Sequence, residues 1–189
     1  MSGNVTGIIL AGGKSSRMGN DKAFVKYKNK YLIEYAIEAL TEECSDILIS
    51  ANDDIYSQFG FLVIEDIFPD TGPMGGIYSC LKHSSCERNV VLPCDMPGVS
   101  AELVRYLLSF AEGENTIVAE SVDNKIEPLC AVYHKTTLPV FEKFLRQEEY
   151  AMNKLLNALQ VKKVCISEDI SFYRRKIFWN INTFDDLIC

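Results

Sequence analysis

Short apolar runs alternate with longer amphipathic stretches, and this alternation restricts the possible folds more than any other feature of the chain. The short runs have the length and branched apolar content of buried strands, and they lie at residues 5–10, 46–51, 61–65 and 89–95. The longer stretches repeat apolar residues at helical spacing and lie at residues 31–40, 75–83 and 101–110. This rhythm predicts an α/β fold with a mostly parallel sheet and helices on both of its faces.

The remaining third of the chain continues the pattern. Strand-like runs lie at residues 116–120, 128–134 and 161–166, and helix-like stretches at residues 138–147 and 152–159. No repeat, low-complexity tract or long linker separates them from the first part. We therefore expect one domain spanning residues 1–189.

Composition is that of an ordinary globular protein. The chain has 189 residues, of which 48% are hydrophobic and 24% are charged. No apolar run approaches the roughly 18 residues that a membrane span needs, and the first residues, MSGNVTG, do not resemble a signal peptide. Seven cysteines without any C-x-x-C pair favour reduced thiols. We expect a cytoplasmic protein with no membrane partner.

Two segments at the ends of predicted strands indicate the expected ligand site. Gly12 and Gly13 follow the strand at 5–10, and Asp95 ends the apolar run at 89–95. Ligands of open α/β sheets bind beyond the carboxyl ends of strands, where segments from different strands meet. Asp95 could also be a turn residue, but its expected place beside the glycines favours a functional role.

The glycine segment fits neither of two common phosphate-binding templates. A P-loop needs a glycine five positions before its Gly-Lys pair, and Ile8 occupies that position relative to Gly13-Lys14. The dinucleotide pattern G-x-G-x-x-G fails because Gly12 and Gly13 are adjacent. A strand, a glycine turn and a basic loop remain, and this combination can still approach phosphate oxygens with backbone N–H groups and with Arg17 and Lys22.

Charge is distributed unevenly. The net charge of −7 argues against nucleic acid as the main partner. Six lysines and arginines nevertheless fall between residues 14 and 30, where Asp21 is the only acidic residue. The segment predicts a site for a small polyanion such as a triphosphate.

Four blocks resemble the nucleotidyltransferases built on a Rossmann-like sheet, and among them the molybdenum cofactor guanylyltransferase family. The blocks appear in the family's order and read LAGGKSSRMG with DK at 10–22, IED with GPMGGI at 64–77, PCDMP at 93–97, and NINTFDDL at 180–187. The resemblance implies a Rossmann-like three-layer α/β/α fold with a mostly parallel sheet and an antiparallel strand in its C-terminal part. It also implies that the enzyme transfers GMP from GTP to the terminal phosphate of molybdopterin, with Mg²⁺ as cofactor.

The resemblance assigns roles to residues at matching positions. The residues that it implies bind the nucleotide are Leu10, Ala11, Gly12, Gly13, Lys22, Asp66 and Asp95. Those that it implies act in catalysis are Arg17, Lys22 and Asp95, with Asp95 as the Mg²⁺ ligand. Asn180 and Asn182 would lie on the acceptor side, although both could instead cap a helix beginning near Thr183. Molybdoenzyme chaperones and molybdopterin-inserting enzymes are the implied protein partners.

Some positions differ from the family pattern. Ser50 stands where some members have asparagine, Phe184 replaces the proline usual in the last block, and residues 146–156 lack the Gly-x-Arg that often precedes this helix. The acceptor is therefore the part of the implied function with the least sequence support. Two alternatives stay open, a cytidylyltransferase acting on the pterin cofactor or a sugar-like alcohol, and a non-catalytic GTP-binding module.

Overall fold

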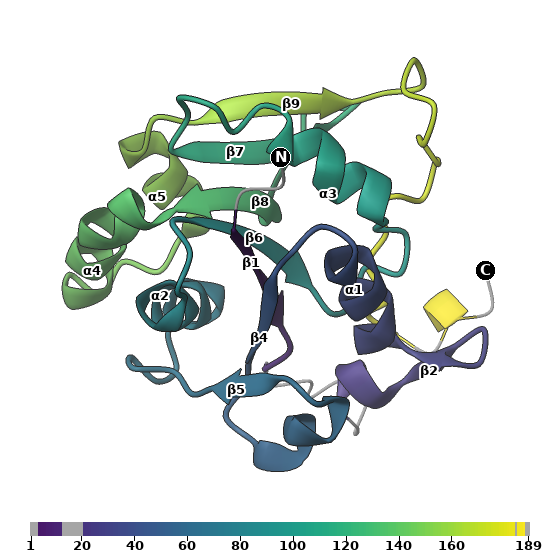
Figure 1. Ribbon diagram of the computed structural model, residues 1–189, viewed down its shortest axis with the longest axis horizontal. Coiled ribbons are helices and arrows are strands. Elements are labelled where there is room, and N and C mark those ends of the chain that lie inside the picture. Colours follow the sequence, from purple (N-terminus) through teal and green to yellow (C-terminus); the bar gives the residue numbers. More distant parts are fainter. Residues whose placement is uncertain (1–3, 13–20, 184, 188–189) are drawn as a thin grey trace.

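The computed structural model describes residues 4–12, 21–183 and 185–187. Its centre is a seven-stranded sheet with the strand order β5-β4-β1-β6-β8-β7-β9 (Figure 1). The strands are β1 (Val5–Leu10), β4 (Asp46–Ser50), β5 (Leu62–Ile64), β6 (Arg88–Pro93), β7 (Thr116–Ser121), β8 (Ile126–His134) and β9 (Lys162–Ile166). Each of the predicted strands is present, most of them within two residues of the expected ends.

The direction of the strands confirms a mostly parallel sheet. β1 pairs in parallel with β4 and with β6, β4 pairs in parallel with β5, and β7 pairs in parallel with β9. β8 alone runs antiparallel to both of its neighbours, β6 and β7. The expected antiparallel strand in the C-terminal part is therefore confirmed as β8.

Helices cover both faces of the sheet, as the alternation predicted (Figure 1). The helices are α1 (Leu32–Thr41), α2 (Pro73–His83), α3 (Ala101–Leu108), α4 (Leu138–Arg146) and α5 (Met152–Ala158). The apolar sides of α1 and α3 share one core with Ile9, whereas α2, α4 and α5 share the other with Ile8. Neighbouring side chains of a strand point to opposite faces, so the fully buried pair Ile8 and Ile9 supplies both cores from the central strand.

One hairpin and several short 3-10 helices were not predicted. β2 (Lys26–Tyr27) and β3 (Lys30–Tyr31) form an antiparallel pair, and Lys28 and Asn29 turn between them with φ values of 46° and 70°. The turn has the left-handed backbone of a tight hairpin, which asparagine tolerates better than most residues. 3-10 helices lie at Lys22–Phe24, Asp54–Phe59, Lys135–Thr137 and Asp185–Leu187.

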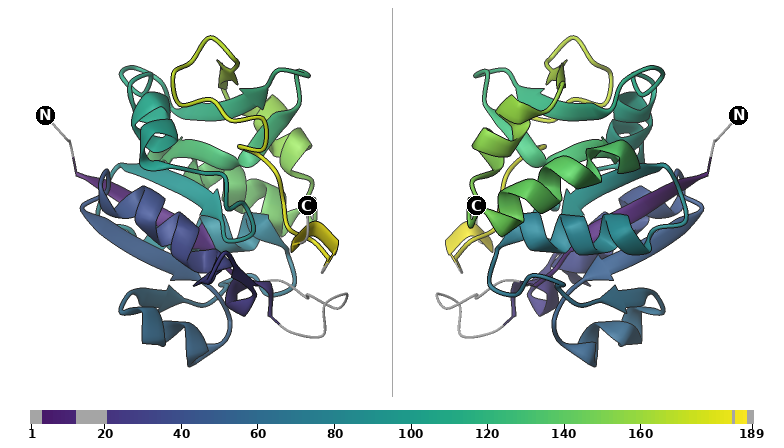
Figure 2. Two further views of the ribbon diagram at one scale, coloured as in Figure 1. Left: turned by 90° about the vertical axis from the view of Figure 1, so that its right-hand side faces the viewer. Right: turned by 90° about the vertical axis from the view of Figure 1, so that its left-hand side faces the viewer.

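The C-terminal segment after β9 returns along the side of the molecule to the region of β2 (Figure 2). Ile181 in this segment is completely buried in a small cluster with Val25 and Leu32. Burying an isoleucine side chain contributes roughly 1.5–3 kcal/mol, which helps to hold the segment against the N-terminal half. The sequence block around residue 181 is thereby brought next to residues that precede it by about 150 positions.

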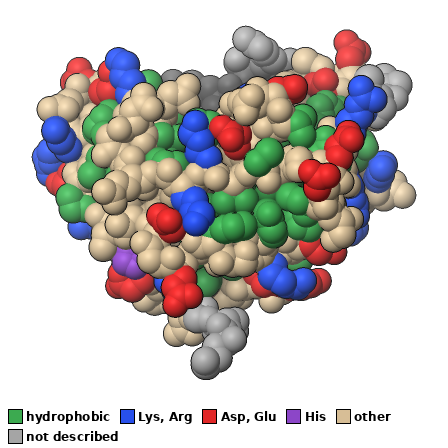
Figure 3. Space-filling model, turned by 90° about the horizontal axis from the view of Figure 1, so that it is seen from above, with side chains coloured by type: hydrophobic (Ala, Val, Ile, Leu, Met, Phe, Trp, Pro, Cys, Tyr) green, Lys and Arg blue, Asp and Glu red, His purple; other side chains and the backbone are tan. Residues whose placement is uncertain are grey.

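The surface over β9 and its surrounding loops carries lysine and arginine side chains beside aspartate and glutamate, with hydrophobic side chains between them (Figure 3). Ion pairs between β9 and its surroundings include Lys163 with Glu120 and Lys162 with Glu114. Within the described ranges, no helix is both long and apolar enough to cross a membrane.

Candidate active site

The register of the sheet brings four strand ends to one level. Leu10 at the end of β1 lies opposite Ser50 of β4 and Pro93 of β6, and Ser50 lies opposite Ile64 of β5. The residues that follow these ends must therefore meet at one edge of the sheet. The segments brought together are Ala11-Gly12, Ala51-Asn52, Glu65-Asp66 and Cys94-Asp95.

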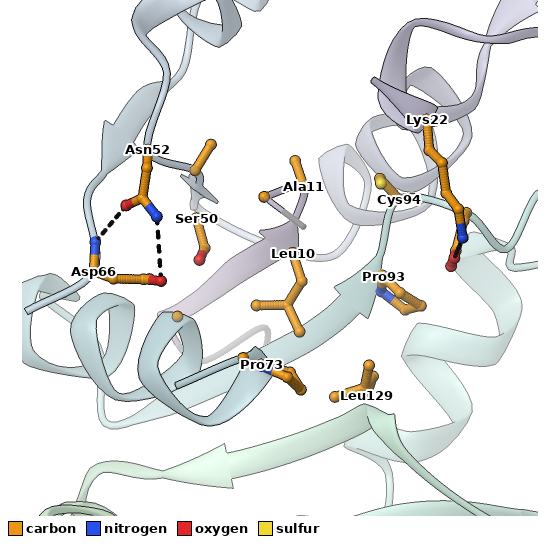
Figure 4. Close-up of a pocket in the computed structure, with 15 residues that line it drawn as sticks. Leu10, Ala11, Lys22, Ser50, Asn52, Asp66, Pro73, Pro93, Cys94 and Leu129 are labelled. Carbon is orange, nitrogen blue, oxygen red and sulfur yellow. Dashed lines mark hydrogen bonds and ion pairs between the residues drawn. The ribbon is translucent and has the colours of Figure 1, made fainter. Parts of the chain in front are cut away.

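A cavity of about 290 Å³ lies at this edge. Asn52 and Asp66 face each other on one side of it, and Lys22 stands on the other (Figure 4). The other residues that line it are Leu10, Ala11, Gly12, Ser50, Ala51, Gly72, Pro73, Gly76, Pro93, Cys94, Asp95 and Leu129. A second cavity of about 540 Å³ also contacts Gly12, Asn52 and Asp66 and extends the first towards Asp21 and Asp53. Together they offer an elongated space with room for a nucleotide.

In the described part of the glycine turn, the backbone N–H groups are already hydrogen-bonded within the protein, and the glycine serves to avoid a steric clash. The N–H groups of Ala11 and Gly12 both donate to the carbonyl oxygen of Ser50, at 3.0 Å each. A Cβ atom at Gly12 would lie 3.2 Å from Cα of Ala51, so a side chain there would crowd the neighbouring backbone. The expectation of free backbone donors is therefore wrong for Ala11 and Gly12, because the adjacent strand end already uses them.

Lys22 is held by two acceptors that come from distant parts of the chain. Its Nζ donates to Oδ2 of Asp95 at 3.3 Å and to Oδ1 of Asn182 at 2.6 Å. The side chains of Lys22 and Asp95 are each 22% exposed, so the ammonium group can still reach a ligand in the cavity. The structure thus places three of the predicted site residues in direct contact, and their roles stay predictions.

Local structure explains why Lys22 stands at this point. Asp21 precedes the 3-10 helix Lys22–Phe24 and accepts a hydrogen bond from the N–H of Ala23 at 3.1 Å. This side-chain cap fixes the start of the helix and hence the direction of the lysine that begins it.

Backbone contacts position the C-terminal block beside Asp95. The N–H of Ile181 donates to the carbonyl oxygen of Asp95 at 2.9 Å. Capping is performed by Asp186, whose Oδ2 accepts from the N–H groups of Asn182 and Thr183. The side chain of Asn182 faces Lys22, and the capping alternative for Asn182 stays untested because Phe184 lies outside the described residues. Asn180 is partly buried in the same segment, and its acceptor role stays a prediction.

Asp66 and Asn52 form a polar pair on the other side of the cavity. The N–H of Asp66 donates to Oδ1 of Asn52 at 2.9 Å, and Nδ2 of Asn52 donates to Oδ2 of Asp66 at 3.4 Å. Burial raises the pKa of Asp66, and the hydrogen bond from Asn52 lowers it by less. The carboxylate keeps unused acceptor capacity that N–H or O–H groups of a nucleoside can occupy.

The donor set around Asp95 fits Mg²⁺. Among the described residues, no group of three or more His, Cys, Asp or Glu side chains could hold a metal ion. Mg²⁺ does not need such a cluster, because it commonly binds one or two carboxylates and completes its shell with phosphates and water. Asp95 offers a hard oxygen ligand at the cavity wall.

Cys94 lines the cavity without the properties of a nucleophile. It is 7% exposed, and burial raises the pKa of its thiol, as does the nearby charge of Asp95. A thiol in such surroundings stays protonated and unreactive. We therefore interpret Cys94 as a structural residue of the cavity wall.

Two predicted residues, Gly13 and Arg17, lie outside the described residues, so their positions stay predictions. Conversely, sequence reasoning missed Asn52 and Tyr56. Asn52 follows a strand end, as Asp66 does, and this position could have revealed it. Tyr56 lies in a short 3-10 helix, and no local pattern connects it with the site.

Comparisons with known proteins agree with this geometry. Residues 7–164 match the family model described as "MobA-like NTP transferase domain". A probable molybdenum cofactor guanylyltransferase of Clostridium perfringens is 38% identical over 185 residues, which cover 94% of this chain and 91% of that protein. A molybdenum cofactor guanylyltransferase of Vibrio parahaemolyticus is 37% identical, with coverage of 95% and 91%. The crystal structure of molybdopterin-guanine dinucleotide biosynthesis protein A from Archaeoglobus fulgidus superimposes with a TM-score of 0.82 at 26% identity, covering 97% of this chain and 95% of that one.

Proposed function

Because the chain belongs to the MobA-like NTP transferase family, we propose that it is a nucleotidyltransferase that transfers GMP from GTP to the terminal phosphate of molybdopterin. The products would be molybdopterin guanine dinucleotide and pyrophosphate. The observation that carries the proposal is that Lys22 and Asp95 line one cavity with Gly12 at the carboxyl ends of β1, β4 and β6, where Lys22 also contacts Asn182. The guanylyltransferase names of the relatives support the choice of GTP and of the acceptor.

The proposed reaction is a direct displacement. The terminal phosphate oxygen of the acceptor forms a bond to the α-phosphorus of GTP, and the bond from that phosphorus to the β-phosphate oxygen breaks. Pyrophosphate leaves with the electron pair of that bond. No covalent enzyme intermediate is required, in agreement with the protonated thiol at Cys94.

This chain's residues would bind and orient the two substrates. Lys22 would place a positive charge against the phosphates. At the other side of the cavity, Asp66 would accept hydrogen bonds from the nucleoside half, and Asn52 would exchange hydrogen bonds with it. Asp95 would hold Mg²⁺, which when bound neutralises phosphate charge. Leu129, Asn180 and Asn182 would contact the acceptor side.

We further propose that the chain works as one domain, because both of its halves supply residues to the cavity. Leu10, Lys22 and Asp66 come from the N-terminal half, whereas Asp95 and Leu129 come from the C-terminal half, which also supplies Asn182 as a partner of Lys22. A cytoplasmic location and the contacts with molybdoenzyme chaperones and molybdopterin-inserting enzymes stay predictions.

A thermal-shift comparison of GTP, CTP and ATP with Mg²⁺ tests the nucleotide. A ligand that binds the folded state and is present at a concentration of about 100 times its Kd stabilises that state by about 2.7 kcal/mol. At equal concentrations, the nucleotide with the lowest Kd should therefore raise Tm most. We expect GTP to do so. A larger shift with CTP would favour the cytidylyltransferase.

A transfer assay then separates an enzyme from a binding module. Labelled GMP should move from GTP to molybdopterin with release of pyrophosphate, and the Lys22→Ala variant should lose most of this activity. Strong GTP binding without pyrophosphate release in the presence of molybdopterin would favour the non-catalytic module.

A further inference from the structure

Tyr56 is a buried side chain within an exposed segment. The 3-10 helix Asp54–Phe59 that carries it lies at the surface, yet Tyr56 is 1% exposed. Its ring packs against Phe24, with a centroid distance of 5.2 Å, and Phe24 in turn stacks on Phe59. Asp53 caps this short helix by accepting from the N–H of Ile55 at 3.0 Å.

The hydroxyl group of Tyr56 contacts Ala11 and Asp21, which lie on either side of residues 12–20 in the sequence. It donates to the carbonyl oxygen of Ala11 at 2.7 Å and to Oδ2 of Asp21 at 2.5 Å. Ala11 begins the glycine turn, and Asp21 immediately precedes Lys22. One phenolic proton is thus shared between two acceptors that are ten positions apart in the sequence.

Asp21 also holds the first turn of the helix that carries Lys22. The other carboxylate oxygen of Asp21, Oδ1, accepts from the N–H of Ala23 and caps the helix that begins with Lys22. The ammonium group of Lys22 then donates to Asp95 and Asn182. Hydrogen bonds through Asp21 therefore link the buried tyrosine to the first turn of the helix that begins with Lys22, whose side chain reaches the cavity.

From these contacts we propose that Tyr56 is a positioning residue, which holds Ala11 and Asp21 together and thereby directs Lys22 towards the phosphates of the bound nucleotide. The inference rests on the proposed function, because it assumes that Lys22 contacts a nucleotide phosphate. Burial raises the pKa of the Tyr56 hydroxyl, as do its hydrogen bond with Asp21 and the charge of that residue, so the group keeps its proton at physiological pH.

The hydroxyl is the part of the side chain that the inference concerns. Phenylalanine would preserve the ring and its packing against Phe24 but would leave Ala11 and Asp21 without their shared donor. Tyr56→Phe should thus disturb the position of Lys22 more than the fold. A small displacement of a phosphate-binding group is sufficient to reduce rates by up to about a hundredfold.

The test compares Tyr56→Phe with Tyr35→Phe. Tyr35 also donates its hydroxyl proton to a backbone carbonyl, that of Tyr27 at 2.7 Å, but neither Tyr35 nor Tyr27 lines either cavity, whereas Tyr56 lines the second one. Binding of Mg²⁺ with GTP is measured by titration calorimetry, transfer to molybdopterin by labelled GMP, and folding by circular dichroism. We expect Tyr56→Phe to weaken binding or lower kcat/KM by about tenfold to a hundredfold. Tyr35→Phe should stay within about twofold of the wild type.

A double variant separates positioning from general damage. In the Lys22→Ala background, Tyr56→Phe should cost much less in GTP affinity than it does in the wild type, because the group that it positions is absent. A folded Tyr56→Phe protein with wild-type affinity and kcat/KM would overturn the inference, and so would an equal loss in both backgrounds. Failure of the wild-type protein to bind GTP would instead overturn the proposed function.

Discussion

Replacing Asp95 with asparagine should separate the contribution of this residue to folding from its contribution to catalysis. Asparagine keeps the size and shape of the side chain and removes one negative charge. In the structure that charge lies 3.3 Å from the ammonium group of Lys22, at the end of β6. The change therefore alters the electrostatics of the cavity wall with little effect on packing.

The cost to folding should be small. Two unit charges at 3.3 Å attract by about 5 kcal/mol at an effective dielectric constant of about 20. Each side chain is 22% exposed, so the two charges lose part of their hydration when the pair forms, and this loss offsets much of the attraction. In the variant, Asn182 still accepts a hydrogen bond from Lys22. We expect a net loss of about 1 kcal/mol in the free energy of unfolding, or about 2–4 °C in Tm.

The cost to turnover should be much larger. If Asp95 holds Mg²⁺ against the reacting phosphates, its charge acts on the transition state, and removing such a contact lowers the rate by roughly two to four powers of ten. That corresponds to about 3 to 5 kcal/mol. Binding of GTP without metal should change little, and excess Mg²⁺ or Mn²⁺ should restore part of the activity.

The assay follows labelled GMP transfer over a Mg²⁺ titration, with circular dichroism melting as the measure of folding. Asp46→Asn is the matched control, because Asp46 begins β4 at the opposite edge of the sheet and, among the described residues, its Oδ1 accepts only a local hydrogen bond from the N–H of Ile47. A folded Asp95→Asn protein with a near-normal rate and unchanged Mg²⁺ dependence would refute the reasoning. The metal would then be held elsewhere, and the PCDMP block would be a structural turn.

Three further predictions concern other residues of the site. Lys22→Ala should raise the KM for GTP more than Lys14→Ala, because Lys22 stands at the cavity whereas Lys14 is out of P-loop register. If this assignment is wrong, steady-state kinetics of the two variants would show the larger rise in KM for Lys14→Ala. Cys94→Ala should keep turnover within about tenfold, because burial keeps the thiol protonated, whereas complete loss in a folded variant would indicate covalent catalysis. The raised pKa of Asp66 means that it takes up a proton at higher pH than a free aspartate, so GTP affinity should fall as the pH decreases through that range. Asp66→Asn should bind GTP more weakly at neutral pH and lose this dependence in calorimetric titrations from neutral to acidic pH.

Local patterns were sufficient to predict the elements of the fold. The strand Val5–Leu10 has the predicted ends, because a short run rich in branched apolar residues followed by glycines is a local signal of a buried strand and its end. The same argument placed Asp95 at a strand end, where ligands bind, whereas Asp66 was identified through the family resemblance. The hairpin at residues 26–31 was missed because strands of two residues show no periodicity.

Only the tertiary structure decided which residues meet. Asn182 contacts Lys22 across 160 positions, because Ile181 is buried against Val25 and Leu32. No periodicity or propensity reports such a contact, since it depends on the strand order and on how the last segment packs.

The same limit applies to the donors and acceptors of the site. The sequence by itself determined the α/β class, the glycine turn and the acidic strand ends, because these depend on interactions between near neighbours in the chain. The tertiary structure decided that the amides of Ala11 and Gly12 are occupied by Ser50 and that Tyr56 joins Ala11 to Asp21. These contacts depend on the pairing register of β1 with β4 and on the packing of a surface helix, both of which are set by long-range burial of apolar surface.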